Sequence, residues 1–159
     1  IQRSNVNGWH SKNFKIEKDN IPYNFVKSIH AYVKEVIVDG FGWKYVPEKV
    51  GVSEIWAIIN KKGTFNSSHN HPGSYLSAAY YVKAPNNCGN IHFYDPNEIK
   101  KFNSPSTEKL TELSTSGFSI KPEEGHLLIL PSYLYHDVGK SLSDEDRIVI
   151  SFNVSILPN

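Results

Sequence analysis

From Ser53 onward, this chain consists of short β-rich runs separated by turns. Valine, isoleucine, tyrosine and phenylalanine are concentrated in these runs, as they are in the strands of pleated sheets. The eight runs cover residues 54–60, 68–71, 76–82, 91–94, 118–121, 126–130, 134–138 and 147–156. Eight short strands are typical of a jelly roll, in which two Greek keys form two facing sheets. The sequence therefore predicts a mainly β fold, a double-stranded β-helix.

The segment before these runs has a different pattern, which predicts one amphipathic helix. Asn20 supplies a capping side chain, Pro22 a first-turn proline, and Gly40 ends the segment. Apolar residues recur between them at helical spacing: Phe25, Ile29, Tyr32, Val33, Val36 and Ile37. Such a stripe is typical of a helix that packs on the outer face of a sheet. We expect a single domain over 1–159, with a helical layer at 1–52 and an eight-stranded core at 53–159.

Composition excludes several classes of protein. The single cysteine, Cys88, excludes an internal disulfide framework and a cysteine-based zinc site. The net charge is +1 with acidic and basic residues interspersed, which argues against a dedicated nucleic-acid surface. No apolar segment is long enough to predict a membrane span. We expect a cytoplasmic protein, in the host cytoplasm if it is encoded by a phage.

One long polar connection, residues 96–117, interrupts the regular spacing of the strands. It could carry a short helix over 109–113. Connections of this length in compact domains are usually binding loops, lids or disordered segments. Both an active-site lid and a disordered insertion are compatible with this sequence.

The sequence His69-Asn70-His71 stands between two apolar runs and suggests a metal site. Residues two apart on a strand point to the same face, so both imidazoles can converge on one ion. A third histidine, His136, lies beside a later strand-like run, and Arg147 begins the last one. Three ligands on one side would leave positions open for substrate and oxygen, as in mononuclear non-haem iron sites.

Five blocks of the sequence, in their order and spacing, resemble the 2-oxoglutarate and Fe(II)-dependent oxygenase superfamily. They are 56–60, 69–82, 89–93, 125–136 and 147–153, and the opening 7–11 adds to the likeness. The chain most resembles a small group of uncharacterised bacterial and phage members, and it is also similar to prolyl hydroxylases. This resemblance covers nearly the whole chain, and it implies a jelly roll that binds Fe(II) and the cosubstrate 2-oxoglutarate.

The resemblance also implies roles for particular residues. His69 and His136 would be iron ligands, and Arg147 would pair with the far carboxylate of 2-oxoglutarate. A planar guanidinium fork suits that carboxylate geometrically. Ser151 could add a hydroxyl hydrogen bond, and Tyr81 matches a position where members of the superfamily place a phenol that contacts the cosubstrate.

The sequence departs from the superfamily at the second ligand. Most members have Asp or Glu two residues after the first histidine, whereas this chain has His71. Either His69, His71 and His136 form a three-histidine site, or His71 is the first ligand and Gly73 marks a vacant carboxylate position. We favour three histidines, because Pro72 would disturb the strand between His71 and Gly73.

The implied reaction consumes 2-oxoglutarate and O2, releases succinate and CO2, and hydroxylates a C–H bond of a peptide or polar small molecule. The expected substrate-pocket residues are Tyr75, His92, Tyr94, Tyr133 and Asn153. Two alternatives remain, a cupin-like metalloprotein that does not use 2-oxoglutarate and an inactive jelly-roll binding module. A homodimer is the expected oligomer if the chain self-associates.

Overall fold

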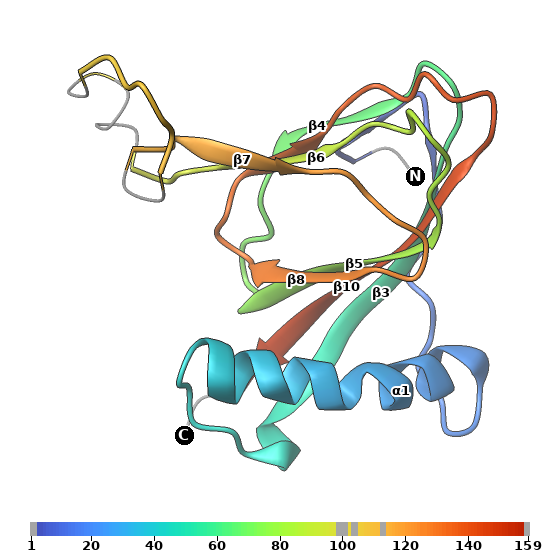
Figure 1. Ribbon diagram of the computed structural model, residues 1–159. Coiled ribbons are helices and arrows are strands. Elements are labelled where there is room, and N and C mark those ends of the chain that lie inside the picture. Colours follow the sequence, from blue (N-terminus) through green and yellow to red (C-terminus); the bar gives the residue numbers. More distant parts are fainter. Residues whose placement is uncertain (1–2, 98–101, 103–104, 112–113, 158–159) are drawn as a thin grey trace.

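Two five-stranded antiparallel sheets face each other, and one helix layer lies outside the second sheet (Figure 1). The computed structural model describes residues 3–97, 102, 105–111 and 114–157. The first sheet has the order β1 (Asn5–Val6), β4 (Phe65–His69), β9 (His136–Val138), β6 (Ile91–Tyr94) and β7 (Gly117–Ile120). The second has the order β2 (Trp9–His10), β3 (Val50–Asn60), β10 (Arg147–Ile156), β5 (Leu76–Lys83) and β8 (Leu127–Pro131). The predicted jelly roll is confirmed.

Each of the eight predicted runs contains a strand, but some boundaries differ. The run expected at 68–71 is a strand that ends at His69, because residues 72 and 73 form a turn. The run expected at 134–138 begins only at His136. Strands β1 and β2 were not predicted. Each has two residues, which is too short for an alternating pattern to be recognised.

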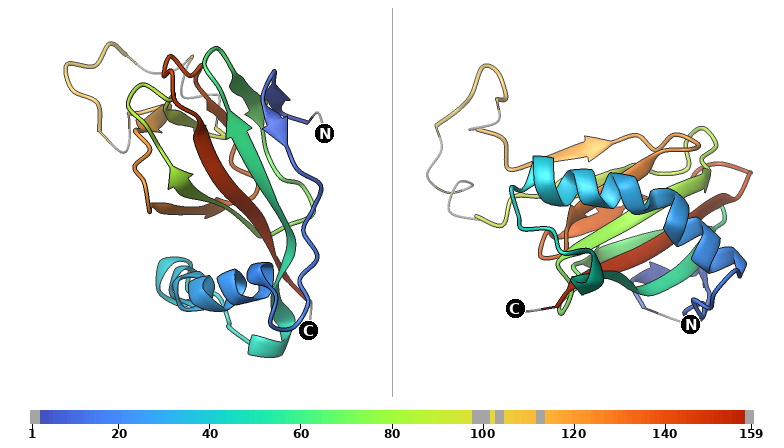
Figure 2. Two further views of the ribbon diagram at one scale, coloured as in Figure 1. Left: turned by 90° about the vertical axis from the view of Figure 1, so that its right-hand side faces the viewer. Right: turned by 90° about the horizontal axis from the view of Figure 1, so that it is seen from below.

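The predicted helix is α1 (Ile21–Glu35), which continues as a π-helical turn over Val36–Gly40. The Asn20 side chain accepts a hydrogen bond from the Tyr23 N–H at 2.9 Å, so Asn20 is the N-cap as expected. A short 3-10 turn, Pro47–Lys49, then leads into β3. Figure 2 shows α1 lying across the strands of the second sheet. None of the described helices is both long and apolar enough to cross a membrane.

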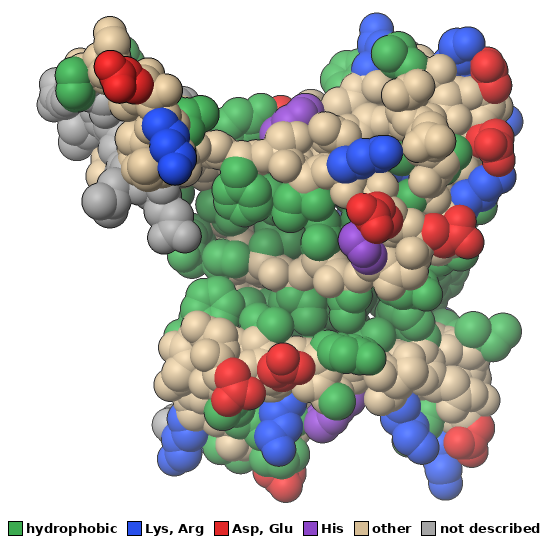
Figure 3. All heavy atoms as spheres, viewed as in Figure 1, with side chains coloured by type: hydrophobic (Ala, Val, Ile, Leu, Met, Phe, Trp, Pro, Cys, Tyr) green, Lys and Arg blue, Asp and Glu red, His purple; other side chains and the backbone are tan. Residues whose placement is uncertain are grey.

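An apolar hollow of about 1030 Å³ separates part of the α1 layer from the edge strands β7 and β8. Figure 3 shows hydrophobic side chains gathered along this hollow. Its lining includes Phe25, Tyr32, Phe118, Leu128 and Leu134.

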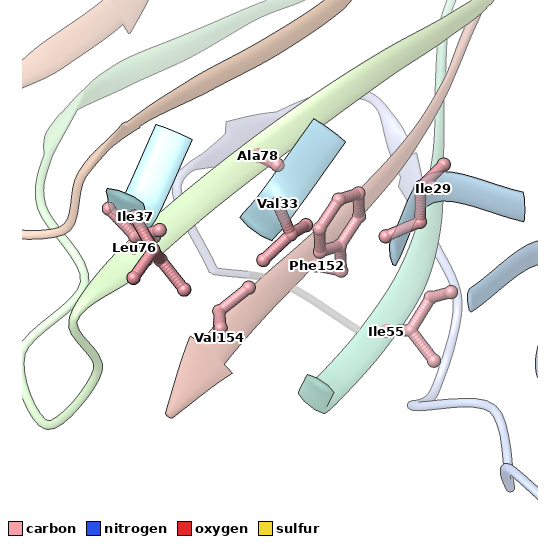
Figure 4. Packing of buried hydrophobic residues seen from close by; sticks show 8 residues of the cluster. All are labelled: Ile29, Val33, Ile37, Ile55, Leu76, Ala78, Phe152 and Val154. Carbon is pink, nitrogen blue, oxygen red and sulfur yellow. The ribbon is translucent and has the colours of Figure 1, made fainter. Parts of the chain in front are cut away.

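The main core lies between α1 and the outer face of the second sheet (Figure 4). Ile29, Val33 and Ile37 of the helical layer are buried there. They pack against residues from three neighbouring strands: Ile55, Leu76, Ala78, Phe152 and Val154. Successive strand residues point to opposite faces, so the residues between these apolar ones point toward the first sheet. The inner face is therefore free to form a polar cavity.

The long connection expected over 96–117 falls partly outside the described residues. No helix is present at Lys109–Thr111, and residues 112–113 of the expected helix lie outside the described part of the chain. The choice between an active-site lid and a disordered insertion stays a prediction.

Candidate metal centre

Three histidines meet on the inner face of the first sheet. His69 is the last residue of β4 and pairs across the ladder with His136, the first residue of β9. His71 follows β4, and its N–H donates to the Ser132 carbonyl at 2.9 Å. The ring centroids lie 4.4 to 5.3 Å apart, and one potential ligand atom from each ring lies within 4.8 Å of the others. In the described part of the chain, no carboxylate belongs to this cluster.

A turn at residues 72 and 73 follows His71 directly. Gly73 has a φ of 88°, and the order Pro72-Gly73 suits the central positions of a type II turn. Trp56 of β3 stacks on the His71 ring, with centroids 6.0 Å apart. The positive φ of this turn therefore explains the glycine at position 73 without any role in metal binding. This supports three histidines over a vacancy at Gly73.

The hydrogen bonds of His69 and His136 prepare both rings for metal binding. Nδ1 of His69 lies 2.8 Å from the Ser67 carbonyl, and Nδ1 of His136 lies 2.9 Å from the Leu134 carbonyl. A carbonyl only accepts, so each Nδ1 carries the proton. Each Nε2 then keeps a lone pair for a ligand bond.

Burial keeps these imidazoles neutral. Desolvation, reinforced by the neighbouring His69 and His136, lowers the pKa of His71 to about 3. Desolvation likewise lowers the pKa of His136 to about 4 and lowers the pKa of His69. All three are therefore unprotonated near neutral pH, which is the form that binds a metal ion.

Arg147 lies in the same cavity and is 1% exposed. Its Nη1 donates to the carbonyls of Cys88 and Gly89, at 2.9 and 3.3 Å. Its Nε is buried and has no hydrogen-bond partner among the described residues. Desolvation lowers the Arg147 pKa, yet an arginine side chain stays charged in proteins. An unpaired donor on a buried cation suits an anionic ligand.

Tyr81 and Ser151 also line the cavity. Burial raises the pKa of Tyr81 to about 12, so its phenol keeps the proton that it could donate. Arg147, Ser151 and Asn153 all lie on the cavity side of β10, as their alternation in the sequence predicts. The structure thus brings together the expected metal and cosubstrate residues in one cavity of about 530 Å³.

Four of the five expected substrate-pocket residues do not line this cavity, and we do not retain them in the proposed site. His92 and Tyr94 lie on the outer face of β6, where both hydrogen-bond the Asp137 carboxylate. Ile91 and Phe93, the alternate residues of β6, are buried and face inward instead. Tyr75 packs beside Trp43, and Tyr133 is exposed. Only Asn153 lines the cavity.

His10, Glu54 and Trp56 are among the lining residues that were not predicted from the sequence. The Trp56 ring stacks between His71 and His10, with its centroid 5.7 Å from that of His10. The alternation along residues 54–60 predicts that Glu54 and Trp56 share one face of the strand. Which face meets the cavity becomes clear only from the strand pairing.

The donor set fits Fe(II) and an oxoacid. Neutral imidazole nitrogens are suitable iron ligands, and a three-histidine cluster leaves further coordination positions open. The unpaired Nε of Arg147 fits a carboxylate in the same cavity.

Residues 54–153 match the family described as "Putative 2OG-Fe(II) oxygenase". A search of curated proteins gives no match. Among solved structures, the chain is similar to an oxidoreductase of the 2OG-Fe(II) oxygenase family from Burkholderia pseudomallei, with 11% identity and a TM-score of 0.65. The match covers 93% of this chain and 66% of that one.

A prolyl-4-hydroxylase from Pseudomonas putida has 11% identity and a TM-score of 0.62, over 95% of this chain and 73% of that one. The viral collagen prolyl hydroxylase of Paramecium Bursaria Chlorella virus-1, solved with 2-oxoglutarate, has 15% identity and a TM-score of 0.58, over 95% and 80%. At these identities the structures support the fold alone, whereas the family match covers most of the chain. The chain therefore belongs to the family of 2OG-Fe(II) oxygenases, whose cofactors are Fe(II) and the cosubstrate 2-oxoglutarate.

Proposed function

We propose that this chain is a 2-oxoglutarate-dependent dioxygenase whose Fe(II) is held by His69, His71 and His136. One observation carries the proposal: three neutral imidazoles and a buried guanidinium with an unpaired Nε line the same cavity. The imidazoles supply nitrogen ligands, and the guanidinium supplies the charge that an oxoacid needs.

Arg147 binds the far carboxylate of 2-oxoglutarate in this proposal, through Nε. Ser151 and Tyr81 offer two hydroxyl donors on the same side of the cavity. The apolar side chains of Ile91, Leu130 and Val149 exclude water from the cavity wall. Bound iron with 2-oxoglutarate and O2 would supply the oxidising chemistry, which hydroxylates a C–H bond and yields succinate and CO2.

The substrate is a peptide or a polar small molecule, of which Asn153 would be one contact. The cytoplasmic location and the homodimer stay predictions.

The test is iron stoichiometry after anaerobic reconstitution, followed by succinate release in air with and without 2-oxoglutarate. We expect about one iron per chain and succinate only when 2-oxoglutarate is present. His69→Ala should lose iron. His126→Ala removes an exposed histidine outside the cavity and should keep it.

The result also separates the alternatives. Bound iron and full turnover of another substrate without 2-oxoglutarate would indicate a cupin-like metalloprotein. A folded protein that takes up neither Fe(II) nor Ni(II) would be a binding module. Either outcome would contradict the proposed function.

The second ligand needs its own pair of variants. If three histidines bind the ion, His71→Asp should retain iron, because a carboxylate then stands at the same position. If Gly73 marks a vacancy and His71 is the first ligand, His71→Asp should lose iron and His69→Ala should keep it. Parallel iron determinations on the two variants therefore distinguish the arrangements.

A further inference from the structure

A polar row crosses the inner face of the second sheet beyond the histidines. On β10, Asn153 pairs with Glu54 of β3 on one side and with Ser77 of β5 on the other. The Asn153 Nδ2 donates to Glu54 Oε2 at 2.9 Å, and the Ser77 hydroxyl donates to Asn153 Oδ1 at 2.9 Å. Asn13 Nδ2 donates to Glu54 Oε1 at 3.0 Å. Both oxygens of the half-buried carboxylate are thus held in place.

Strand register places this row on the far side of the metal centre from Arg147. Arg147 pairs with Asn60 at one end of the β3–β10 ladder, and Ser151 pairs with Trp56 between the two ends. Trp56 stacks on His71, so the metal centre lies over this middle row. The Asn153–Glu54 row lies two residues further along, about 7 Å away. A cosubstrate held by Arg147 approaches the ion from one side, which leaves the Glu54 side for the substrate.

Among the described residues, no basic side chain forms an ion pair with Glu54. Glu54 is the one acidic residue among the described residues that line it. The two lining arginines are engaged elsewhere, because Arg147 Nη1 binds two carbonyls and the Arg3 guanidinium lies over the Trp56 ring. The hydrogen-bond donors to Glu54, Asn13 and Asn153, are neutral amides, which orient a carboxylate without neutralising it.

We propose that Glu54 is a substrate-binding residue that pairs with an ammonium group of the substrate, and this inference rests on the proposed function. A carboxylate oxygen has two lone pairs, so each oxygen can accept one bond beyond its amide contact. An ammonium ion supplies both the donors and the missing charge. Partial burial strengthens such a pair relative to one in water.

The experiment uses protein loaded with Ni(II), as a redox-inert surrogate, and 2-oxoglutarate. The probes are three amines and their matched alcohols: n-butylamine and n-butanol, n-hexylamine and n-hexanol, benzylamine and benzyl alcohol. Ligand-observed NMR titrations at pH 7 give the Kd values. At least one amine should bind wild type tenfold or more tightly than its alcohol. Glu54→Gln should abolish that preference.

Glu48→Gln is the matched control, because Glu48 is exposed on the turn before β3 and does not line the cavity. It should retain the preference of wild type. Amine binding that is equal to alcohol binding in wild type, or a preference that survives in Glu54→Gln, would overturn the inference.

Calorimetry of Ni(II) and 2-oxoglutarate binding keeps the two proposals distinguishable. If wild type and Glu54→Gln both bind Ni(II) and 2-oxoglutarate but wild type shows no amine preference, only the inference about Glu54 fails. If wild type binds neither Ni(II) nor 2-oxoglutarate, the proposed function fails, and this inference fails with it.

Discussion

Arg147 is a charged side chain in a buried position, where loss of hydration is unfavourable. Taking a guanidinium out of water costs several kcal/mol unless hydrogen bonds compensate. Among the described residues, Arg147 has hydrogen-bond partners for Nη1 and none for Nε. The bonds to the Cys88 and Gly89 carbonyls fix the fork so that Nε remains for a ligand. This arrangement suits an anionic ligand.

Arg147→Lys should weaken 2-oxoglutarate binding about tenfold or more, since it keeps the charge but removes the fork, and each ~1.4 kcal/mol corresponds to about tenfold in affinity. Ni(II) affinity should change less than twofold, because Arg147 is not among the three histidines of the candidate metal centre. Calorimetric titrations of both ligands check this. Unchanged 2-oxoglutarate affinity in a folded variant would remove Arg147 from the cosubstrate site.

The metal-free protein should lose stability as the pH falls below about 6.5. The unfolded chain binds protons on its histidines near that pH, whereas folded His136 and His71 bind them only near 4 and 3. The free energy of unfolding should therefore fall between pH 7 and pH 5 by about 1 to 2 kcal/mol for each of these histidines. Urea titrations of the metal-free protein at pH 7 and pH 5 measure this free energy of unfolding.

His136→Gln is the control for this pH effect, because it removes one of the titrating rings. Its free energy of unfolding should fall less than that of wild type over the same pH interval. Equal stability of wild type at pH 7 and pH 5 would show that the histidines are not held neutral by the fold.

The proposed metal and cosubstrate residues could be named from the sequence because their side-chain chemistry is specific. His69, His71, His136 and Arg147 stand in a spacing that indicates a site before any fold is known. Glu54 was not predicted, since its place in the cavity depends on which face of β3 meets that cavity. His92 lies outside the cavity lining for a similar reason, because the alternation along a strand decides whether a polar side chain faces in or out.

At the scale of elements, α1 closes the outer face of the second sheet and stays out of the cavity. Ile37→Ala should destabilise the fold by roughly 2 to 5 kcal/mol, because it leaves a hole in a fully buried position. Ni(II) and 2-oxoglutarate affinities should not change in the folded variant. Ile37 lies in the π-helical turn that continues α1, and Ile21→Ala at the first residue of α1 is the matched control. Ile21 is 85% exposed, so this change should alter stability by less than about 0.5 kcal/mol.

Urea unfolding of the two variants measures the difference. Equal stabilities would mean that the helix layer contributes little to the fold.

The helix itself could be predicted from the capping residue and the apolar spacing. The exact ends of β4 and β9 could not, since a turn and one cross-strand pair set them.

At the scale of the whole molecule, the two sheets supply different residues of the site. The first sheet and the turn after β4 supply the three histidines, and the second supplies Arg147, Tyr81, Ser151 and the Glu54 row. The metal would thus lie between a cationic end and an anionic end of one cavity. In this arrangement, cosubstrate and substrate would approach from opposite directions.

A crystal structure of the protein soaked with Ni(II) and 2-oxoglutarate tests this arrangement most directly. We expect one ion bound to His69, His71 and His136, at about 2.1 Å from each Nε2 as for other imidazole–metal bonds, and the far carboxylate of 2-oxoglutarate on Arg147 Nε. An ion held by His71 and His136 with the His69 ring turned away, or 2-oxoglutarate bound away from Arg147, would contradict the account.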